Sequence, residues 1–278
     1  MSTSAAATDD RAGVHLQWPD EAPNSRTRSA GWRQCAAMTA RAVRSARVEN
    51  EFLIAVVMPA VFALGLYLPL KSVMEQRGLD YAQFLVPIIV LQTSAFTAVS
   101  AAQRSALDAM RGMNRRLSVM PVRSFVPLTS RMVTNTVRSI VSVVAAVLYG
   151  SVLGFRFGGS VLDPVMFVGF ALLVGAVFSL GADALGLLAR NPEATSQLLV
   201  LPQLVLGLLS TGFAPESSFP EWAQPFARNQ PISHFAAALR ELAQGTPHLS
   251  TFLPAALWLA GLTAVFVPLA VRAQRKSL

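Results

Sequence analysis

Apolar residues along the chain fall into six long blocks that are separated by polar segments. Each block is close to the ~20 residues that an α-helix needs to cross the hydrocarbon core of a bilayer. The pattern therefore predicts an all-α integral membrane protein with six transmembrane helices, over residues 52–70, 84–102, 133–155, 162–188, 196–213 and 252–271.

Charge is scarce in this chain and lies beside the apolar blocks. Of the 278 residues, 53% are hydrophobic and 14% are charged, against about 25% charged in an ordinary soluble domain. The net charge of +8 is not gathered in one soluble domain, which argues against nucleic acid as a partner. If both termini are cytoplasmic, 18 Lys and Arg lie inside and 5 lie outside. The positive-inside rule then predicts a multi-pass protein of the cytoplasmic (inner) membrane with cytoplasmic N- and C-termini.

The first fifty residues are polar and precede the first block. Residues 1–28 are mixed in charge, lack the apolar core of a signal peptide and are expected to form a disordered cytoplasmic tail. Residues 29–50 place four arginines on one side of a helical wheel, which predicts an amphipathic helix in the membrane interface. That helix either binds membrane lipids or a partner, or only anchors the topology. Residues 51–278 form the membrane domain.

The segment 104–124 is the longest predicted cytoplasmic loop between spans. On a helical wheel its charged residues share one face and its methionines lie opposite, as in a helix that docks on a partner. Gly112 is unfavourable inside such a helix and predicts a bend or a close contact there, while Pro121 ends the helix. A flexible basic tether would satisfy the topology without needing two faces. The charged face comprises Arg104, Asp108, Arg111 and Arg115.

The sequence contains no recognisable catalytic or metal-binding motif. A GxxxxGK[ST] phosphate loop, a GxSxG elbow and an HExxH pair are all missing. The single cysteine, Cys35, and the three scattered histidines do not have metal-ligand spacing. The chain is therefore expected not to be an enzyme and to hold no cofactor or metal of its own. An ATP-driven role would need a separate ATPase chain that binds ATP and Mg.

One carboxylate, Asp183, falls inside an apolar block. A charge at membrane depth is costly and normally has a partner. Arg138 lies seven residues after Arg131, at the expected border of the third span. Asp183 lies seven residues before Arg190, so in neighbouring antiparallel helices Arg138 and Asp183 would share a depth. We therefore expect either an Arg138–Asp183 ion pair or a carboxylate hydrogen-bonded to helix hydroxyls.

Residues 214–246, after the fifth block, are too polar to span a membrane alone, yet they carry several aromatic residues. Prolines divide this stretch into short pieces, which predicts a re-entrant segment at the extracellular surface. Such a segment is either a gate through which a substrate leaves or a cap that seals the bundle. The candidate gate residues are Phe219, Trp222, Asn229, Gln230 and Pro231.

Six residues of the first, second and fifth blocks are weaker candidates for a lipid-accessible substrate path between two such subunits. The two glutamines among them are the most informative, because an amide within a span needs hydrogen-bond partners. Interhelical hydrogen bonding is the simpler role for each glutamine. The six are Met58, Phe62, Gln92, Phe96, Gln203 and Leu206.

Four stretches of the sequence carry a specific family resemblance. They are YAQFLVPIIVLQTSAF (81–96), the D-x3-G-x3-R-x4-P pattern of Asp108, Gly112, Arg116 and Pro121, GLLARNPEATSQLLVLPQ (186–203) and FARNQPISHFAAALREL (226–242). In this order they resemble the ABC-2 type permeases, and within them the daunorubicin-resistance (DrrB) subfamily, which includes mycobacterial permeases of complex-lipid exporters. The resemblance extends from about residue 33 to the C-terminus.

The resemblance implies the fold of an ABC-2, or type V, exporter and the role of its permease subunit. It implies two ATPase subunits of the DrrA type and a second permease, either of the DrrC type or a second copy of this chain. The loop after the second span would contact the ATPase. The matching positions here, together with one neighbouring arginine of the charged face, are Asp108, Gly112, Arg115, Arg116 and Pro121.

The implied substrates are large amphiphiles, either phthiocerol-type cell-wall lipids or hydrophobic drugs such as anthracyclines. One departure from the family is that Ala109 and Met110 follow Asp108, where many members carry an acidic residue, so the salt bridge of that position is not carried over. Other functions stay open: an ABC-2 exporter of a polysaccharide or glycolipid, a membrane-bound lipid-modifying enzyme, and a stand-alone channel or secondary transporter. The last would require more intramembrane charges and internal repeats.

Overall fold

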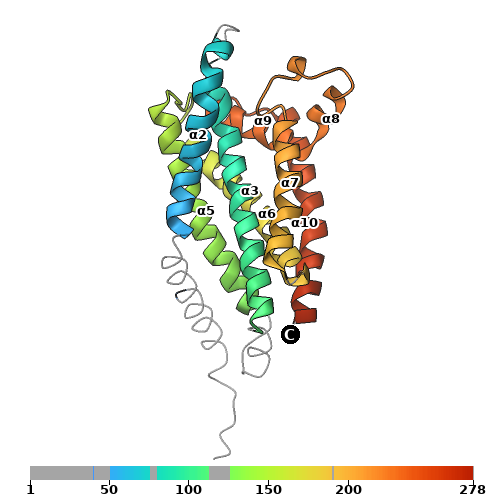
Figure 1. Ribbon diagram of the computed structural model, residues 1–278. Helices are drawn as coiled ribbons and strands as arrows, with labels where there is room; N and C mark the ends of the chain where they lie inside the picture. Colours follow the sequence, from blue (N-terminus) through green and yellow to red (C-terminus); the bar gives the residue numbers. More distant parts are fainter. Residues whose placement is uncertain (1–39, 41–50, 76–79, 113–125, 190, 278) are drawn as a thin grey trace, which may run out of the picture.

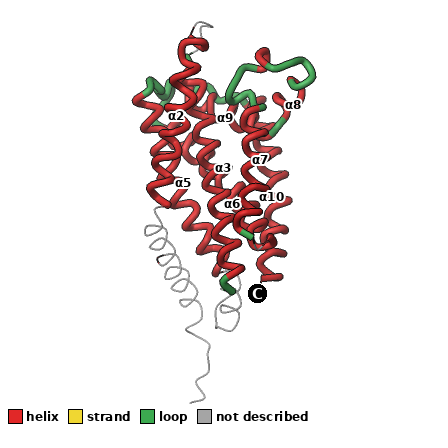
Figure 2. Tube along the Cα trace, in the orientation of Figure 1, coloured by secondary structure: helices red, strands yellow, loops and turns green. Residues whose placement is uncertain are grey.

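The computed structural model describes residue 40 and residues 51–75, 80–112, 126–189 and 191–277. These residues form a bundle of long helices that run side by side, with shorter helices gathered at one end (Figure 1, Figure 2). The C-terminus of the chain lies at the opposite end, which we call the C-terminal end. We call the end with the short helices the α9 end.

Within the described residues, six helices run along the bundle. They are α2 (Glu51–Glu75), α3 (Tyr81–Met110), α5 (Val126–Val152), α6 (Leu162–Ala189), α7 (Pro192–Leu208) and α10 (Leu249–Ser277). At the α9 end, three short helices connect α7 to α10. They are η1 (Glu216–Ser218), α8 (Gln224–Asn229) and α9 (Pro231–Gln244).

The predicted all-helical membrane architecture is confirmed for the described residues. Five of the expected spans correspond to helices that are long and apolar enough to cross a membrane, namely α2, α3, α5, α6 and α10. The remaining expected span, 196–213, corresponds to α7, which has 17 residues and is not among these five. Two expected span boundaries differ from the helix ends. The second span was expected to end at residue 102, but α3 continues to Met110, and the third was expected to begin at residue 133, but α5 begins at Val126.

Two long helices begin at side chains that cap them. Oδ1 of Asp80 accepts hydrogen bonds from the backbone amides of Ala82 and Gln83 at the start of α3. Oδ1 of Asn191 does the same for the amides of residues 193 and 194 at the start of α7, where Pro192 occupies the first helical position. These contacts satisfy backbone donors that have no partner within the helix.

Helix α3 lies at the centre of the bundle and packs against α2, α5, α6, α7 and α9. In an apolar 18-residue stretch of α3, 78% of the residues are buried, against 6% in the corresponding stretch of α10. Leu85 and Ile88 of α3 belong to the same apolar core as Phe167 of α6 and Phe235 of α9. The other helices are therefore arranged around α3.

Glycines on α6 allow its backbone to approach its neighbours closely. A Cβ atom on Gly186 would lie 2.1 Å from the carbonyl oxygen of Ala102 in α3, and one on Gly181 would lie 2.6 Å from the ring of Phe266 in α10. Small residues at helix crossings permit the close packing that holds helices together in a bilayer. The contact between α3 and α6 is thus set by backbone approach at Gly186.

Four hydroxyl groups in the middle of α3 bond to their own helix. The hydroxyls of Thr93 and Ser94 both donate to the carbonyl oxygen of Val90, at 3.0 and 2.9 Å. Thr97 and Ser100 donate to the carbonyls four residues earlier, at 3.0 and 3.1 Å. Such bonds allow hydroxyls to be buried in a membrane helix without a partner on another helix.

The expected tail, residues 1–28, and the expected interfacial helix, residues 29–50, lie outside the described residues apart from residue 40. These two expectations therefore stay predictions.

Replacing Gly186 with Ala is expected to destabilise the protein, because the added Cβ meets a backbone carbonyl that no side-chain rotation can move. Overpacking of this kind costs about 1–3 kcal/mol, which corresponds to a loss of about 2–10 °C in the Tm of the detergent-solubilised protein. Gly169→Ala is the matched control on the same helix, since nothing lies within 4 Å of its Cβ position. Equal Tm values for the two variants would contradict the close approach of α3 and α6.

Candidate functional site

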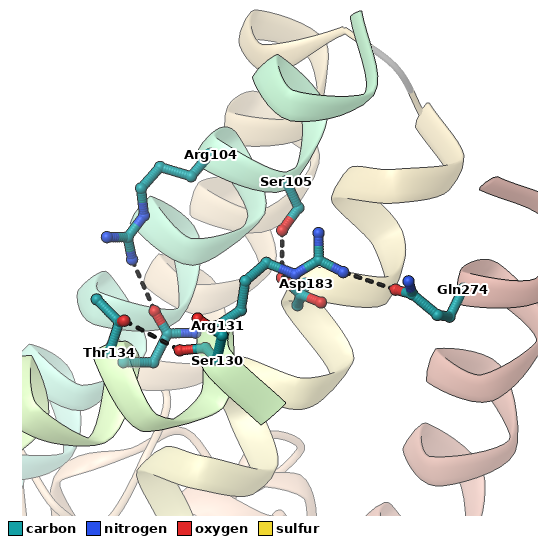
Figure 3. A network of polar contacts seen from close by, with 8 residues as sticks. Arg104, Ser105, Ser130, Arg131, Thr134, Asp183 and Gln274 are labelled. Atoms are coloured by element: carbon teal, nitrogen blue, oxygen red, sulfur yellow. Dashed lines mark hydrogen bonds and ion pairs between the residues drawn. The ribbon is translucent and has the colours of Figure 1, made fainter. Parts of the chain in front are cut away.

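A cluster of polar side chains lies buried between four helices at the C-terminal end of the bundle (Figure 3). Its members come from α3, α5, α6 and α10, close to the two helix ends that flank residues 113–125. At its centre is Asp183, whose side chain is 1% exposed. We call this group the Asp183 cluster; it consists of Arg104, Ser105, Arg131, Asn135, Asp183 and Gln274.

Asp183 of α6 is held by one residue from each of two neighbouring helices. The Nε atom of Arg131 on α5 lies 3.3 Å from Oδ1 of Asp183. The hydroxyl of Ser105 on α3 donates a hydrogen bond to the same oxygen. This carboxylate is therefore a common partner of α3, through a hydrogen bond, and of α5, through an ion pair.

Two further hydrogen bonds extend the cluster. The Nη2 atom of Arg131 donates to Oε1 of Gln274 on α10, at 2.7 Å. The Nη2 atom of Arg104 on α3 donates to Oδ1 of Asn135 on α5, also at 2.7 Å. Arg131 thus links α5 to both α6 and α10, and α3 has a second polar contact with α5.

The structure gives Asp183 an ion-pair partner that was not expected, namely Arg131. The expected Arg138–Asp183 pair stays a prediction. The expectation placed the membrane border at Arg131, but α5 begins at Val126 and α6 ends at Ala189. Arg131 lies five residues inside α5 and Asp183 six residues inside α6, about 8 Å from the helix ends in each case, so these two side chains meet at one depth. The alternative expectation, a hydroxyl donor, is met by Ser105.

The ion pair constrains the helices more than it stabilises them. Taking two charges out of water costs about as much as their attraction returns, so an intact buried pair adds little net stability. Removing one partner costs about 3–5 kcal/mol, because the other charge then stays buried alone. Any arrangement of α5 and α6 must therefore keep Arg131 and Asp183 together or supply a substitute for each.

Part of the expected ATPase-contacting segment 104–124 is described. Helix α3 continues without a break through Asp108 and ends at Met110, so these residues extend the membrane helix. Gly112 has a φ of 64°, and among the described residues no atom lies within 4 Å of a Cβ placed on it. It follows the end of α3 in a left-handed conformation, so the chain leaves the helix direction there. The expected close contact at Gly112 stays a prediction. Arg115, Arg116 and Pro121 lie outside the described residues.

Asp108 is partly buried and lies within electrostatic reach of the Asp183 cluster. The cations whose charges act on its carboxylate are Arg131, Arg104 and Arg111. The last described turn of α3 is therefore linked by charge to α5 as well as by the hydrogen bond between Arg104 and Asn135.

The five candidate gate residues lie at the α9 end but do not form one site. Trp222 is 81% exposed, whereas Gln230 is 4% exposed and is followed by Pro231, the first residue of α9. Asn229 is exposed and donates to the carbonyl of residue 225 at 2.8 Å. Phe219 is partly buried, and its carbonyl accepts from the side chain of residue 224 at 3.0 Å. Gln230 is the member of the set that lies in the protein interior.

A residue of the α9 end that sequence reasoning missed is Arg240. Its guanidinium carbon lies 3.9 Å from the ring centroid of Phe84 on α3, and Nη2 donates to the carbonyl of Phe84 at 3.3 Å. Burial lowers the pKa of Arg240 to about 10, so the side chain stays protonated at neutral pH. This contact fastens α9 to the start of α3. The sequence gives little sign of it, because Arg240 is followed by Glu241 in a helix that also carries Ser233 and His234.

The substrate-path candidates lie on α2, α3 and α7. Phe62 and Phe96 are in ring contact, with centroids 5.3 Å apart, while Met58 and Leu206 are partly buried on α2 and α7. Gln92 is 3% exposed, and its Oε1 lies 3.0 Å from where a Cβ of Gly207 would be. Gln203 is 8% exposed, and neither polar atom of its side chain has a hydrogen-bond partner among the described residues. The two amides therefore lie buried on α3 and α7, two helices that pack against each other.

The fold and the Asp183 cluster define a multi-pass helical membrane protein with charged contacts between its helices. Within the described residues, no group of three or more His, Cys, Asp or Glu side chains is placed to hold a metal ion. The chain belongs to the ABC-2 family: the family model described as ABC-2 family transporter protein matches residues 67–272. The resemblance seen in the sequence is thereby confirmed.

Named relatives are permeases of ABC transporters. The chain is 34% identical over 207 residues to the doxorubicin resistance ABC transporter permease protein DrrB of Mycobacterium tuberculosis, covering 72% of each chain. It is 32% identical over 229 residues to the probable doxorubicin resistance permease DrrC of the same organism, covering 80% of this chain and 81% of DrrC. It is 30% identical over 227 residues to the daunorubicin resistance permease DrrB1 of Streptomyces coeruleorubidus, covering 79% and 78%.

Asp183→Asn and Arg131→Gln are each expected to lower stability, because each leaves the other group buried without its charge partner. The double variant should lose less free energy of unfolding than the two single variants lose in sum, by about 1 kcal/mol or more. Thermal unfolding in detergent measures all four proteins of the cycle. The same cycle with Arg138→Gln in place of Arg131→Gln is the control and should show less coupling. A purely additive Arg131 cycle would rule out the pair.

Proposed function

We propose that this chain is the non-catalytic permease subunit of an ATP-driven ABC exporter. The observation that carries the proposal is its membership of the ABC-2 family, with relatives named as doxorubicin and daunorubicin resistance permeases. ATP hydrolysis then belongs to a separate ATPase chain, which binds ATP and Mg. The helical bundle supplies the path through the cytoplasmic membrane.

The substrates of this exporter are large amphiphiles, either cell-wall lipids or hydrophobic drugs such as anthracyclines. The drugs in the names of the relatives support this class. The buried amides of Gln92 and Gln203 also support it, because they offer hydrogen bonds within an apolar interior to a molecule with both apolar and polar parts. Gln203 has both polar atoms available among the described residues.

In this proposal the C-terminal end of the bundle faces the cytoplasm and receives the ATPase. The excess of Lys and Arg on this side of the expected spans, 18 against 5, supports the orientation, as do Arg275 and Lys276 in the last turn of α10. The ATPase binds the segment 104–124. The residues of this segment that contact the ATPase are Asp108, Gly112, Arg115, Arg116 and Pro121.

The complete exporter contains two ATPase subunits of the DrrA type and a second permease. Similar identities to a DrrB and a DrrC protein of one organism, 34% and 32%, support a pair of two different permeases from this family. A second copy of this chain is the alternative, and the subunit composition of the purified complex decides between them.

The first test is the composition and activity of the native complex. Affinity purification of the tagged chain from its own membranes should recover a nucleotide-binding subunit, and inside-out vesicles should accumulate doxorubicin in the presence of ATP. Lipid analysis of cells that lack the chain identifies a lipid substrate, which should disappear from the outer surface. Recovery of no nucleotide-binding chain would contradict the proposal.

The second test is a charge reversal on the ATPase-contacting segment. Arg116→Glu is expected to reduce recovery of the ATPase or to uncouple transport from ATP hydrolysis, because it reverses the charge of one of the proposed contact residues. The amount of permease in the membrane should not change. Arg275→Glu, exposed on α10 at the same end, is the matched control and should leave both quantities at the wild-type level. Normal ATPase recovery and normal transport in Arg116→Glu would argue against this contact.

A further inference from the structure

The Asp183 cluster joins the two helix ends that flank the proposed ATPase-contacting segment. The last turns of α3 carry Ser105 and the first turns of α5 carry Arg131. Both side chains converge on Oδ1 of Asp183, which belongs to neither helix (Figure 3). A displacement of either helix end therefore acts on one carboxylate of α6.

The same carboxylate is connected to the other end of the bundle through α10. Arg131 donates to Gln274 near the end of α10. At the opposite end of α10, the hydroxyl of Thr251 donates to Glu241 of α9 at 2.5 Å. Between these two contacts α10 packs along α6, where the ring of Phe266 lies against Gly181. Helix α10 is thus attached near both ends and in contact with α6 between them, as an element that transmits movement along the bundle would be.

The cluster also contains the groups that a second arrangement of its bonds would require. Among the described residues, Oδ2 of Asp183 and Nδ2 of Asn135 have no hydrogen-bond partner. A spare acceptor and a spare donor therefore lie next to the guanidinium groups of Arg131 and Arg104. Helix shifts with two discrete sets of polar contacts are a common form of conformational switch.

We propose that Asp183 is a positioning residue for energy coupling. It holds the ends of α3 and α5 against α6 and, through Arg131 and Gln274, against α10. A movement of the segment between α3 and α5 then becomes a joint movement of four helices and reaches the α9 end along α10. The proposal rests on the proposed function, because it needs an ATPase bound at that segment. Asp183 itself touches neither nucleotide nor substrate.

The test compares nucleotide trapping at one end of the complex with a structural change at the other. Cys35 is the only cysteine of the chain, so a Cys35→Ser background allows a single reporter, Gln230→Cys, at a position that is 4% exposed at the α9 end. The rate of labelling with a membrane-impermeant maleimide is measured on the whole complex, with and without ATP and vanadate. With Asp183 intact, trapping should change the rate about fivefold or more.

Asp183→Asn is expected to abolish this change while the complex still traps nucleotide with vanadate. The double variant Arg131→Gln/Asp183→Asn removes both charges and should behave in the same way, which covers the case in which the single variant does not fold. Asp183→Glu keeps the charge and should restore part of the response. Asp163→Asn is the control, since it makes the same change in α6 at the α9 end. Trp222→Cys, 81% exposed, should label rapidly in all states.

Three results would overturn the inference. The first is a labelling change of normal size in Asp183→Asn and in the double variant. The second is the absence of a change in the complex with Asp183 intact, although nucleotide is trapped. The third is a parallel loss of trapping and labelling change in both variants, which would make the pair a purely structural contact. Failure of the proposed function is distinguishable, because the chain with Asp183 intact would then recover no ATPase at all.

Discussion

A carboxylate cannot lie in the interior of a membrane protein unless other groups compensate for the lost water, and the arrangement of four helices here depends on how Asp183 is compensated. Its compensating groups come from α3 and α5, and through Arg131 from α10 as well. A close backbone approach occurs near the same level, since Gly186 lies three residues after Asp183 and meets Ala102, three residues before Ser105. Steric contact and charge therefore fix the same crossing of α3 and α6.

The long helices could be predicted from the sequence because each requires a long uninterrupted apolar stretch, and few other structures would use one. The need of Asp183 for a partner could be predicted for a similar reason, since a lone charge in a span is costly. That Arg131 is a partner of Asp183 could not be predicted. It depended on where α5 begins, and polar residues such as Ser130 and Thr134 conceal the helix start by lowering the hydropathy of its first turns.

Other features depend on contacts between distant residues, which a single sequence does not display. Gln274 and Asn135 are ordinary polar residues near helix ends until Arg131 and Arg104 are placed beside them. Gly112 illustrates a different limit, because a glycine suits both a strained helix interior and the residue after a helix end. Which of the two applies is decided by the point at which α3 leaves the bundle.

The hydroxyl groups in the middle of α3 have a consequence for the mechanics of the bundle. Because Thr93, Ser94, Thr97 and Ser100 donate to carbonyls of their own helix, the middle of α3 can slide or rotate against its neighbours without breaking these bonds. The bonds that resist such sliding lie near the two ends of the helix, at Ser105 and at the carbonyl of Phe84. Hydrogen bonds to other helices thus hold α3 near its two ends, while the hydroxyls of its middle place no such restraint on its position.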